Sequence, residues 1–230
     1  MSYFRIYIYI ILLNWIAVFA DSQIDSTKLI RYNSNFEFNE GLYIHFDQFR
    51  LNNPIQKSRI ISSIDFNSID FMDDIVASSK ISYFDDLGVK HEVETRKIWG
   101  YSKNNLVYIN IGENFNPISI VGNICHFVAT IKNSDPHYSD PFVNPGFGFG
   151  MSTMTPSTYE TTGMQQLLMD MNTGKLYEYT VVSMEILLMK DPQLYDEYMA
   201  LSNRKKKQFK FLYLRKFNEN NPLYFQNINP

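Results

Sequence analysis

The sharpest charge feature of the chain is a run of four consecutive basic residues: Arg204, Lys205, Lys206 and Lys207. Such a run can bind an anionic lipid, glycan or nucleic acid, because each cation attracts a phosphate or a carboxylate. The whole chain nevertheless carries a formal net charge of −3. General nucleic-acid binding needs a basic surface, so we expect no nucleic-acid partner. We keep the four residues as candidate contacts with an anionic surface, beside the simpler interpretation of a solvated helix face.

Residue types that could bind a metal or catalyse a reaction do not occur in useful patterns. The four histidines form no metal-ligand spacing; they are His45, His91, His126 and His137. Cys125 is the only cysteine, so no internal disulfide can form. His126 follows it directly, but neighbouring strand residues face opposite sides, so we expect a buried, unreactive thiol rather than a catalytic dyad. We expect no catalytic residue, metal site or cofactor, and we favour a protein without enzymatic activity.

Residues 170–175 (DMNTGK) imitate the opening of a calcium-binding loop. Gly174 stands where that loop requires an acid, and Lys175 stands where it requires the glycine. The motif therefore predicts a hairpin turn.

A glycine-rich run, residues 146–150 (GFGFG), imitates a phosphate-binding loop, but no lysine follows it and no helix begins there. Glycine leaves the backbone with high conformational entropy, so we interpret residues 145–158 as a mobile loop. Exposed phenylalanines are costly to leave in water unless they bury against something. Phe147 and Phe149 are therefore candidate contacts with a ligand or partner.

Alternation of apolar and polar residues predicts antiparallel strands over residues 80–131 and again after residue 166. Turn residues such as Asn104-Asn105 separate these runs and indicate hairpins. The predicted pairs are residues 81–83 with 89–95, 98–101 with 106–109, 118–121 with 124–131, and 167–171 with 176–180. Trp99 lies in the second pair, and we expect it to be buried.

The pattern becomes helical after Thr180, which can cap a helix. Asp191 followed by Pro192 starts another helix, as an N-cap with proline at the first helical position. We expect the basic run 204–207 late in that helix, where cations complement the helix dipole. The sequence predicts an α+β fold, an antiparallel β meander with C-terminal helices packed on it.

The first twenty residues have the layout of a secretory signal peptide. Arg5 precedes an apolar stretch at residues 6–19, and small residues precede the bond between Ala20 and Asp21, where we expect cleavage. Fourteen helical residues rise about 21 Å, too little for a hydrocarbon core of about 30 Å, although a signal anchor is the alternative. No later apolar run approaches a membrane-spanning length, so we expect no transmembrane segment after signal removal.

The chain then divides into the signal peptide 1–20, a flexible lead-in 21–40 that is rich in polar residues, and a single α+β domain 41–230.

The chain resembles an uncharacterised family of exported Bacteroidota-type proteins, a family with a domain of unknown function. The resemblance rests on several short motifs and on their order along the chain. The motifs are GLY at 41–43, IWGYS at 98–102, YIN at 108–110, Gly122 before an aromatic strand, DMNTGKLY at 170–177, DPQLY at 191–195 and KFNENNPLY at 216–224. The resemblance implies export and no assigned activity, so it assigns no catalytic residue.

These observations predict a bacterial protein that is exported to the periplasm or the outer cell surface. We expect a non-enzymatic binding or structural protein of the cell envelope, with an envelope component as its partner. The alternative is an envelope or polysaccharide hydrolase, which should show two or more titratable side chains converging in a cleft.

Overall fold

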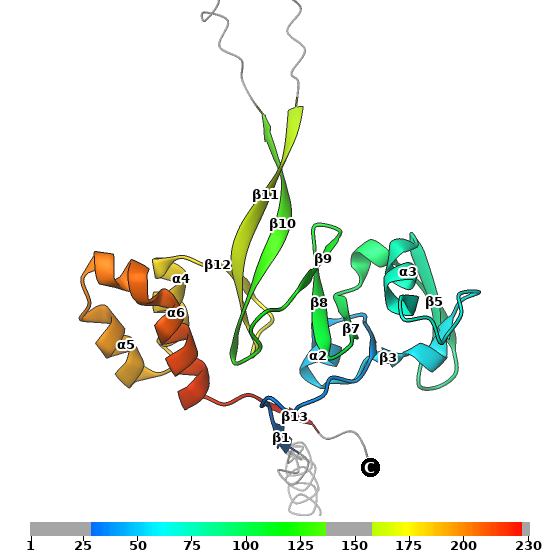
Figure 1. Cartoon of the computed structure of the whole chain (residues 1–230), viewed down its shortest axis with the longest axis horizontal. Helices are drawn as coiled ribbons and strands as arrows, with labels where there is room; N and C mark the ends of the chain where they lie inside the picture. Colours follow the sequence, from blue (N-terminus) through cyan, green and yellow to red (C-terminus); the bar gives the residue numbers. More distant parts are fainter. Residues whose placement is uncertain (1–28, 137–157, 227–230) are drawn as a thin grey trace, which may run out of the picture.

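The computed structural model describes residues 29–136 and 158–226. Three helices gather at one side of the view in Figure 1, a long hairpin stands in the middle, and most of the remaining strands lie at the other side. The helices are α4 (Val181–Leu188), α5 (Pro192–Met199) and α6 (Asn203–Asn220), and the hairpin is β10 (Ile124–Pro136) with β11 (Thr158–Asp170). Antiparallel strands with C-terminal helices confirm the predicted α+β class.

The first sheet has five antiparallel strands in the order β3-β2-β7-β8-β9. Their bounds are β2 (Gly41–Tyr43), β3 (Ile55–Gln56), β7 (Gly100–Lys103), β8 (Leu106–Ile111) and β9 (Asn114–Pro117). The predicted Asn104-Asn105 hairpin is confirmed, and both residues have positive φ, 50° and 59°. That backbone gives a turn whose twist matches the strands it joins, and asparagine tolerates it better than other non-glycine residues.

A second, three-stranded sheet lies beside the first and has the order β4-β5-β6. It consists of β4 (Ile60–Ile61), β5 (Lys80–Phe84) and β6 (Lys90–Glu94), with the short helix α3 (Phe71–Ala77) before β5. The β5–β6 hairpin was predicted from its period of two and is confirmed, with Ile81 opposite Val93. Phe71, Met72 and Ile75 of α3 are buried against this region.

The central hairpin differs from its prediction. The expected pairing of residues 118–121 with 124–131 reduces to one bridge, between Ile120 and His126. Residues 114–117 form β9 on the edge of β8 instead, and β10 pairs along its full length with β11. The long ladder satisfies many more backbone groups than a four-residue pair could, and it therefore determines the register.

Asparagine side chains satisfy the outer edge of β10, where a neighbouring strand would otherwise pair. Asn218 of α6 accepts a hydrogen bond from the Ile124 amide at 2.9 Å and donates one to the Ile124 carbonyl at 2.8 Å. Asn116 accepts one from the Thr130 amide at 3.0 Å. A primary amide offers a donor and an acceptor side by side, as a peptide group does, so it can replace a strand partner.

The core beneath the central hairpin is aromatic. Phe49, in helix α2 (Phe46–Arg50), is fully buried and stacks on Trp99 with ring centroids 4.6 Å apart. Trp99 itself is only half-buried, less than the expected burial, although it packs against this core. The indole covers Phe49 and Phe46 from outside and closes the cluster at the surface.

The segment before the first sheet also enters this core. Strand β1 (Leu29–Arg31) pairs with β13 (Tyr224–Gln226), which joins the two ends of the described fold. Phe36 and Phe38 are buried beside Phe225. The predicted flexible lead-in 21–40 is therefore wrong for residues 29–40. Two phenylalanines spaced by two in an otherwise polar segment bury enough apolar surface to order it.

Helices α4 and α5 begin at the two cap residues predicted from the sequence. Thr180 accepts a hydrogen bond from the Ser183 amide, and Asp191 accepts one from the Leu194 amide, both at 3.1 Å. The basic run was predicted late in the helix that begins at Asp191, and this position is wrong. Helix α5 ends at Met199, and a new helix, α6, begins at Asn203. The run 204–207 therefore occupies the first turn of α6, where the helix dipole disfavours cations.

Residues 170–175 form the predicted hairpin turn between β11 and β12 (Leu176–Glu178). Asp170 accepts hydrogen bonds from the Asn172 amide, the Thr173 hydroxyl and the Lys190 ammonium, the last at 2.6 Å. Burial alone would raise the pKa of Asp170, but these bonds outweigh it, so the pKa lies below its ordinary value of 3.8. The motif therefore builds a charged turn within the fold.

A lowered pKa makes Asp170 a determinant of acid stability. A carboxyl whose pKa is depressed by folding stabilises the protein above its unfolded pKa, and this contribution disappears as the pH falls through the folded pKa. We expect Lys190→Met to move acid unfolding to higher pH, because the loss of the Lys190 bond leaves burial opposed by fewer hydrogen bonds and so raises the pKa of Asp170. Circular dichroism at 222 nm measures it, with Lys205→Met as the control. Equal midpoints for the two variants would contradict this role.

Candidate functional site

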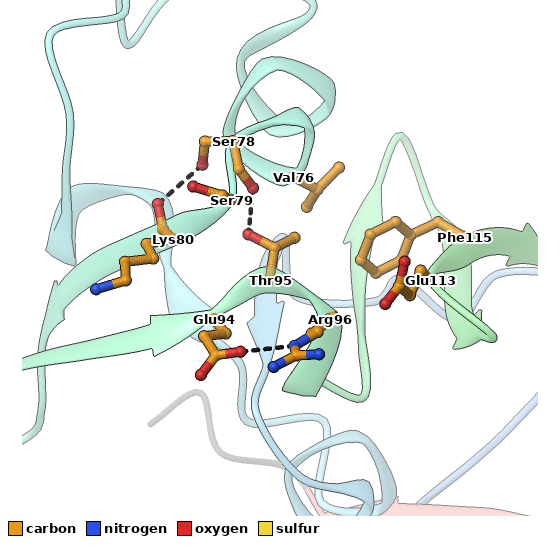
Figure 2. Close-up of a pocket in the computed structure, with 9 residues that line it drawn as sticks. All are labelled: Val76, Ser78, Ser79, Lys80, Glu94, Thr95, Arg96, Glu113 and Phe115. Atoms are coloured by element: carbon orange, nitrogen blue, oxygen red, sulfur yellow. Dashed lines mark hydrogen bonds and ion pairs between the residues drawn. The ribbon is translucent and has the colours of Figure 1, made fainter.

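The candidate site is a shallow depression of about 460 Å³ between the end of β6, the end of α3 and the start of β9 (Figure 2). Three segments far apart in the sequence line it. They contribute Ser78 and Ser79, then Glu94, Thr95 and Arg96, then Glu113 and Phe115. The depression is therefore a product of the tertiary fold, which brings a helix end, a strand end and a hairpin turn together.

The hydroxyl groups at the floor of the depression are held by backbone carbonyls. Thr95 donates a hydrogen bond from Oγ1 to the Ser78 carbonyl, and its amide donates to the Ser79 carbonyl at 3.0 Å. The Ser78 hydroxyl lies 2.6 Å from the Ile75 carbonyl and 2.9 Å from the Lys80 carbonyl (Figure 2). These bonds fix the end of α3 against the turn η3 (Thr95–Lys97) and leave the hydroxyl oxygens as acceptors.

Glu94 is the central charge of the site. Its carboxylate receives hydrogen bonds from Lys97 at 2.8 Å and from Arg96 at 2.6 Å. The Lys97 and Arg96 bonds lower the pKa of Glu94 to about 2. Glu94 therefore remains ionised at neutral pH, and the rim presents fixed charges of both signs.

A second depression of about 500 Å³ adjoins the first on the other side of the turn η3 and shares Arg96 and Glu113 with it. Asn110 lines it and donates from Nδ2 to the carbonyls of Arg96 and Ile98, each at 3.1 Å. Glu113, in the β8–β9 turn with a φ of 72°, lines both depressions. Arg96 thus stands on a ridge between two hollows.

The sequence showed only part of this site. The sequence places Glu94 and Arg96 among the alternating charges of one predicted strand, which indicate an exposed stripe, whereas the structure ends β6 at Glu94 and places Arg96 in η3. Ser78, Asn110 and Glu113 were missed, because they lie on other segments and carry no motif. The one usable signal was the pair Gly112-Glu113, which is typical of a tight hairpin turn and lies close in the fold to the charged strand.

Three of the four residues predicted to form a basic surface are exposed, and the fourth is buried. Arg204, Lys205 and Lys207 are exposed, as a solvent-facing cluster requires. Lys206 was predicted to contact an anionic surface, and this prediction is wrong. Its side chain is 5% exposed, and its ammonium lies 2.7 Å from Glu185. Buried cations are retained when they are paired, so Lys206 holds α6 against α4 and does not face an anionic surface.

Four of the predicted site residues lie outside the described residues; they are Ala20, Asp21, Phe147 and Phe149. Cys125 is confirmed as a buried thiol, and burial raises its pKa to about 12, which keeps it protonated and unreactive.

Within residues 29–136 and 158–226, no three His, Cys, Asp or Glu side chains converge as metal ligands. No helix there has the length and apolar character needed to cross a membrane.

Comparison with known proteins places most of the chain in a family. A model of a family of unknown function (DUF6563) matches residues 41–221, which include both depressions and all three C-terminal helices. No curated protein and no solved structure matches the chain.

Proposed function

The chain belongs to the family of unknown function DUF6563, and we propose that it is an exported, non-enzymatic binding protein of the cell envelope. The observation that carries the binding role is the state of Glu94, which Lys97 and Arg96 hold as an ion. A general acid needs a pKa near the working pH, and a pKa of about 2 is far below it. The carboxylate is suited to attract and orient a ligand.

The ligand class follows from the groups around the two depressions. Arg96 can donate to a carboxylate, Glu94 and Glu113 can accept from an ammonium or a hydroxyl, and Phe115 offers an apolar face. Envelope polymers such as peptidoglycan carry hydroxyl, carboxylate and ammonium groups on one chain. We therefore propose a polar envelope polymer as the ligand, bound across the Arg96 ridge.

Binding is tested with purified protein and soluble peptidoglycan fragments, by isothermal titration calorimetry. We expect Arg96→Ala to weaken binding about tenfold or more, because it removes a charge-assisted hydrogen bond. Arg50→Ala changes another exposed arginine, on α2; it is the matched control and should bind like the unaltered protein. Equal affinities of the Arg96→Ala and unaltered proteins would contradict a site at the ridge.

The alternative function, an envelope or polysaccharide hydrolase, makes a different prediction in the same mixture. A hydrolase would convert the fragments into smaller products, and mass spectrometry of the ligand before and after incubation would detect them. We expect the fragments to keep their mass.

Export is tested separately by expressing the full chain in an exporting bacterial host. We expect a mature species that begins at Asp21, because small residues precede the Ala20–Asp21 bond. Intact-mass measurement distinguishes it from the uncleaved chain. A protein that retains residues 1–20 would contradict the signal-peptide interpretation.

A further inference from the structure

A second group of polar side chains lies at the base of the central hairpin, on the face that turns toward α6. His126 of β10 is half-buried there and lies 3.3 Å from Gln166 of β11, through Nε2 and Oε1. Tyr179, just after β12, lies edge-on to the His126 ring with centroids 4.8 Å apart. Phe211 of α6 closes the other side, with its ring centroid 6.3 Å from that of His126.

Lys210 brings a positive charge into this group. Its Nζ lies 4.0 Å from the centre of the Tyr179 ring and donates a hydrogen bond to the Tyr179 carbonyl at 2.6 Å. Within residues 29–136 and 158–226 Lys210 forms no ion pair, unlike Lys206 one turn earlier, which pairs with Glu185. An ammonium has three donors, so two of those on Lys210 are left for a ligand.

Among the residues that the structure describes, no carboxylate shifts the pKa of His126 or Lys210. Desolvation lowers the pKa of His126, and the Lys210 charge lowers it further, although the Gln166 hydrogen bond acts in the opposite direction. Desolvation also lowers the pKa of Lys210, and no carboxylate opposes the shift. Glu178 directly precedes Tyr179, and neighbouring residues of an extended chain point to opposite faces, so Glu178 faces away from this group.

The surface around this group extends the positive charge. Arg204, Lys207 and Phe211 follow one another at spacings of three and four along α6, so they lie on one helix face. Arg204 and Lys207 are exposed, and they lead from the start of α6 toward His126 and Lys210. Cations placed at the unfavourable end of a helix dipole gain nothing for helix stability, which is consistent with a role in attracting a ligand.

We propose that His126, Gln166 and Lys210, with the rings of Tyr179 and Phe211, form a binding site for a carboxylate carried on a flat apolar body. The carboxylate accepts from Lys210 and from the Gln166 amide, and the flat body packs against the two aromatic rings. Two kinds of ligand share this chemistry, an aromatic acid and a sugar acid whose ring has an apolar face. The site is separate from the Arg96 ridge and does not depend on the function proposed for it.

The proposal is tested by nuclear magnetic resonance on the whole mature protein with four probes. Benzoate and glucuronate represent the two kinds of ligand, while acetate lacks the flat body and benzamide lacks the charge. We expect benzoate or glucuronate to shift the His126 and Gln166 resonances at concentrations about tenfold lower than acetate and benzamide require. The member of the first pair that binds more tightly identifies the source. Shifts that do not distinguish the four probes would overturn the proposal.

Two further measurements separate binding from a structural role. Bound carboxylate should raise the pKa of His126, which its proton chemical shift reports as a function of pH in the unaltered protein; an unchanged pKa would overturn the proposal. Lys210→Met keeps the apolar stem and should weaken binding about tenfold. Lys205→Met, an exposed lysine on the same helix, is the matched control and should leave the affinity unchanged. Equal losses in both variants would indicate attraction by net charge alone, which contradicts a built site.

Discussion

Replacing Phe49 by alanine is expected to lower the free energy of unfolding by about 3–5 kcal/mol, the range found for large aromatic truncations in cores. Phe49 is fully buried and touches rings on several elements. Its neighbours within the cluster are Phe38, Tyr43, Phe46, Trp99 and Phe225. The side chain thus joins the N-terminal segment, the first sheet and the C-terminal strand, and its loss leaves a cavity that all three line.

Urea unfolding followed by tryptophan fluorescence measures this loss, because Trp99 stacks directly on Phe49. Phe66→Ala is the control, since Phe66 is 50% exposed on a loop. It should cost less than about 1 kcal/mol. A similar cost for the two variants would show that the aromatic cluster does not hold the three segments together.

Replacing Asn218 by alanine is expected to cost about 2–4 kcal/mol, because two backbone groups of Ile124 lose their partner at once. Ile124 is fully buried, so little water reaches the freed amide and carbonyl. Gly122 packs so closely on the Asn218 side chain that a Cβ there would lie 2.4 Å from Nδ2. This contact leaves the amide of Asn218 in one position and makes the loss specific.

Two variants sharpen that measurement. Asn218→Asp keeps the acceptor for the Ile124 amide but loses the donor, so it should be destabilised as well. Asn220→Ala, two residues later on α6, removes one hydrogen bond to Asp191 at an exposed position and should cost less than about 1 kcal/mol. If Asn218→Ala unfolds at the same denaturant concentration as Asn220→Ala, the asparagine does not act as a strand partner.

Local signals predicted much of the fold. Period-two alternation located β5, β6, β7 and β8, and the caps at Thr180 and Asp191 located two helix starts. These elements are determined by residues close in sequence. The features that the sequence did not predict depend on contacts between residues far apart in the chain. Examples are the pairing of β1 with β13 and the burial of Phe36. No local pattern reports which remote strand or ring will cover a short apolar segment.

The boundary between α5 and α6 failed for a related reason. Residues 200–202 are compatible with a continuous helix in propensity, and the structure breaks there so that α6 can return along α5. Tyr198 then donates to the Lys206 carbonyl at 3.1 Å, and Lys206 turns inward to Glu185. One buried lysine in a basic run cannot be distinguished from its neighbours by composition alone.

The candidate sites were less predictable than the fold. Glu94 and Arg96 were visible as a charged stripe, but the depression depends on Ser78 and Glu113, which come from other segments. Likewise, the sequence showed His126 beside a buried cysteine, while its partners Lys210 and Tyr179 lie more than fifty residues away. A site that is assembled by tertiary contacts has no characteristic spacing of residues along the sequence, so a motif search cannot find it.

The central claim is that this protein binds an envelope polymer without converting it. The most direct measurement passes soluble peptidoglycan fragments over immobilised mature protein and weighs the eluted ligand by mass spectrometry, for the unaltered protein and for Arg96→Ala. We expect the unaltered protein to retain fragments that elute with unchanged mass, and Arg96→Ala to retain fewer of them. Fragments that elute with lower mass, or that the unaltered protein does not retain, would contradict the claim.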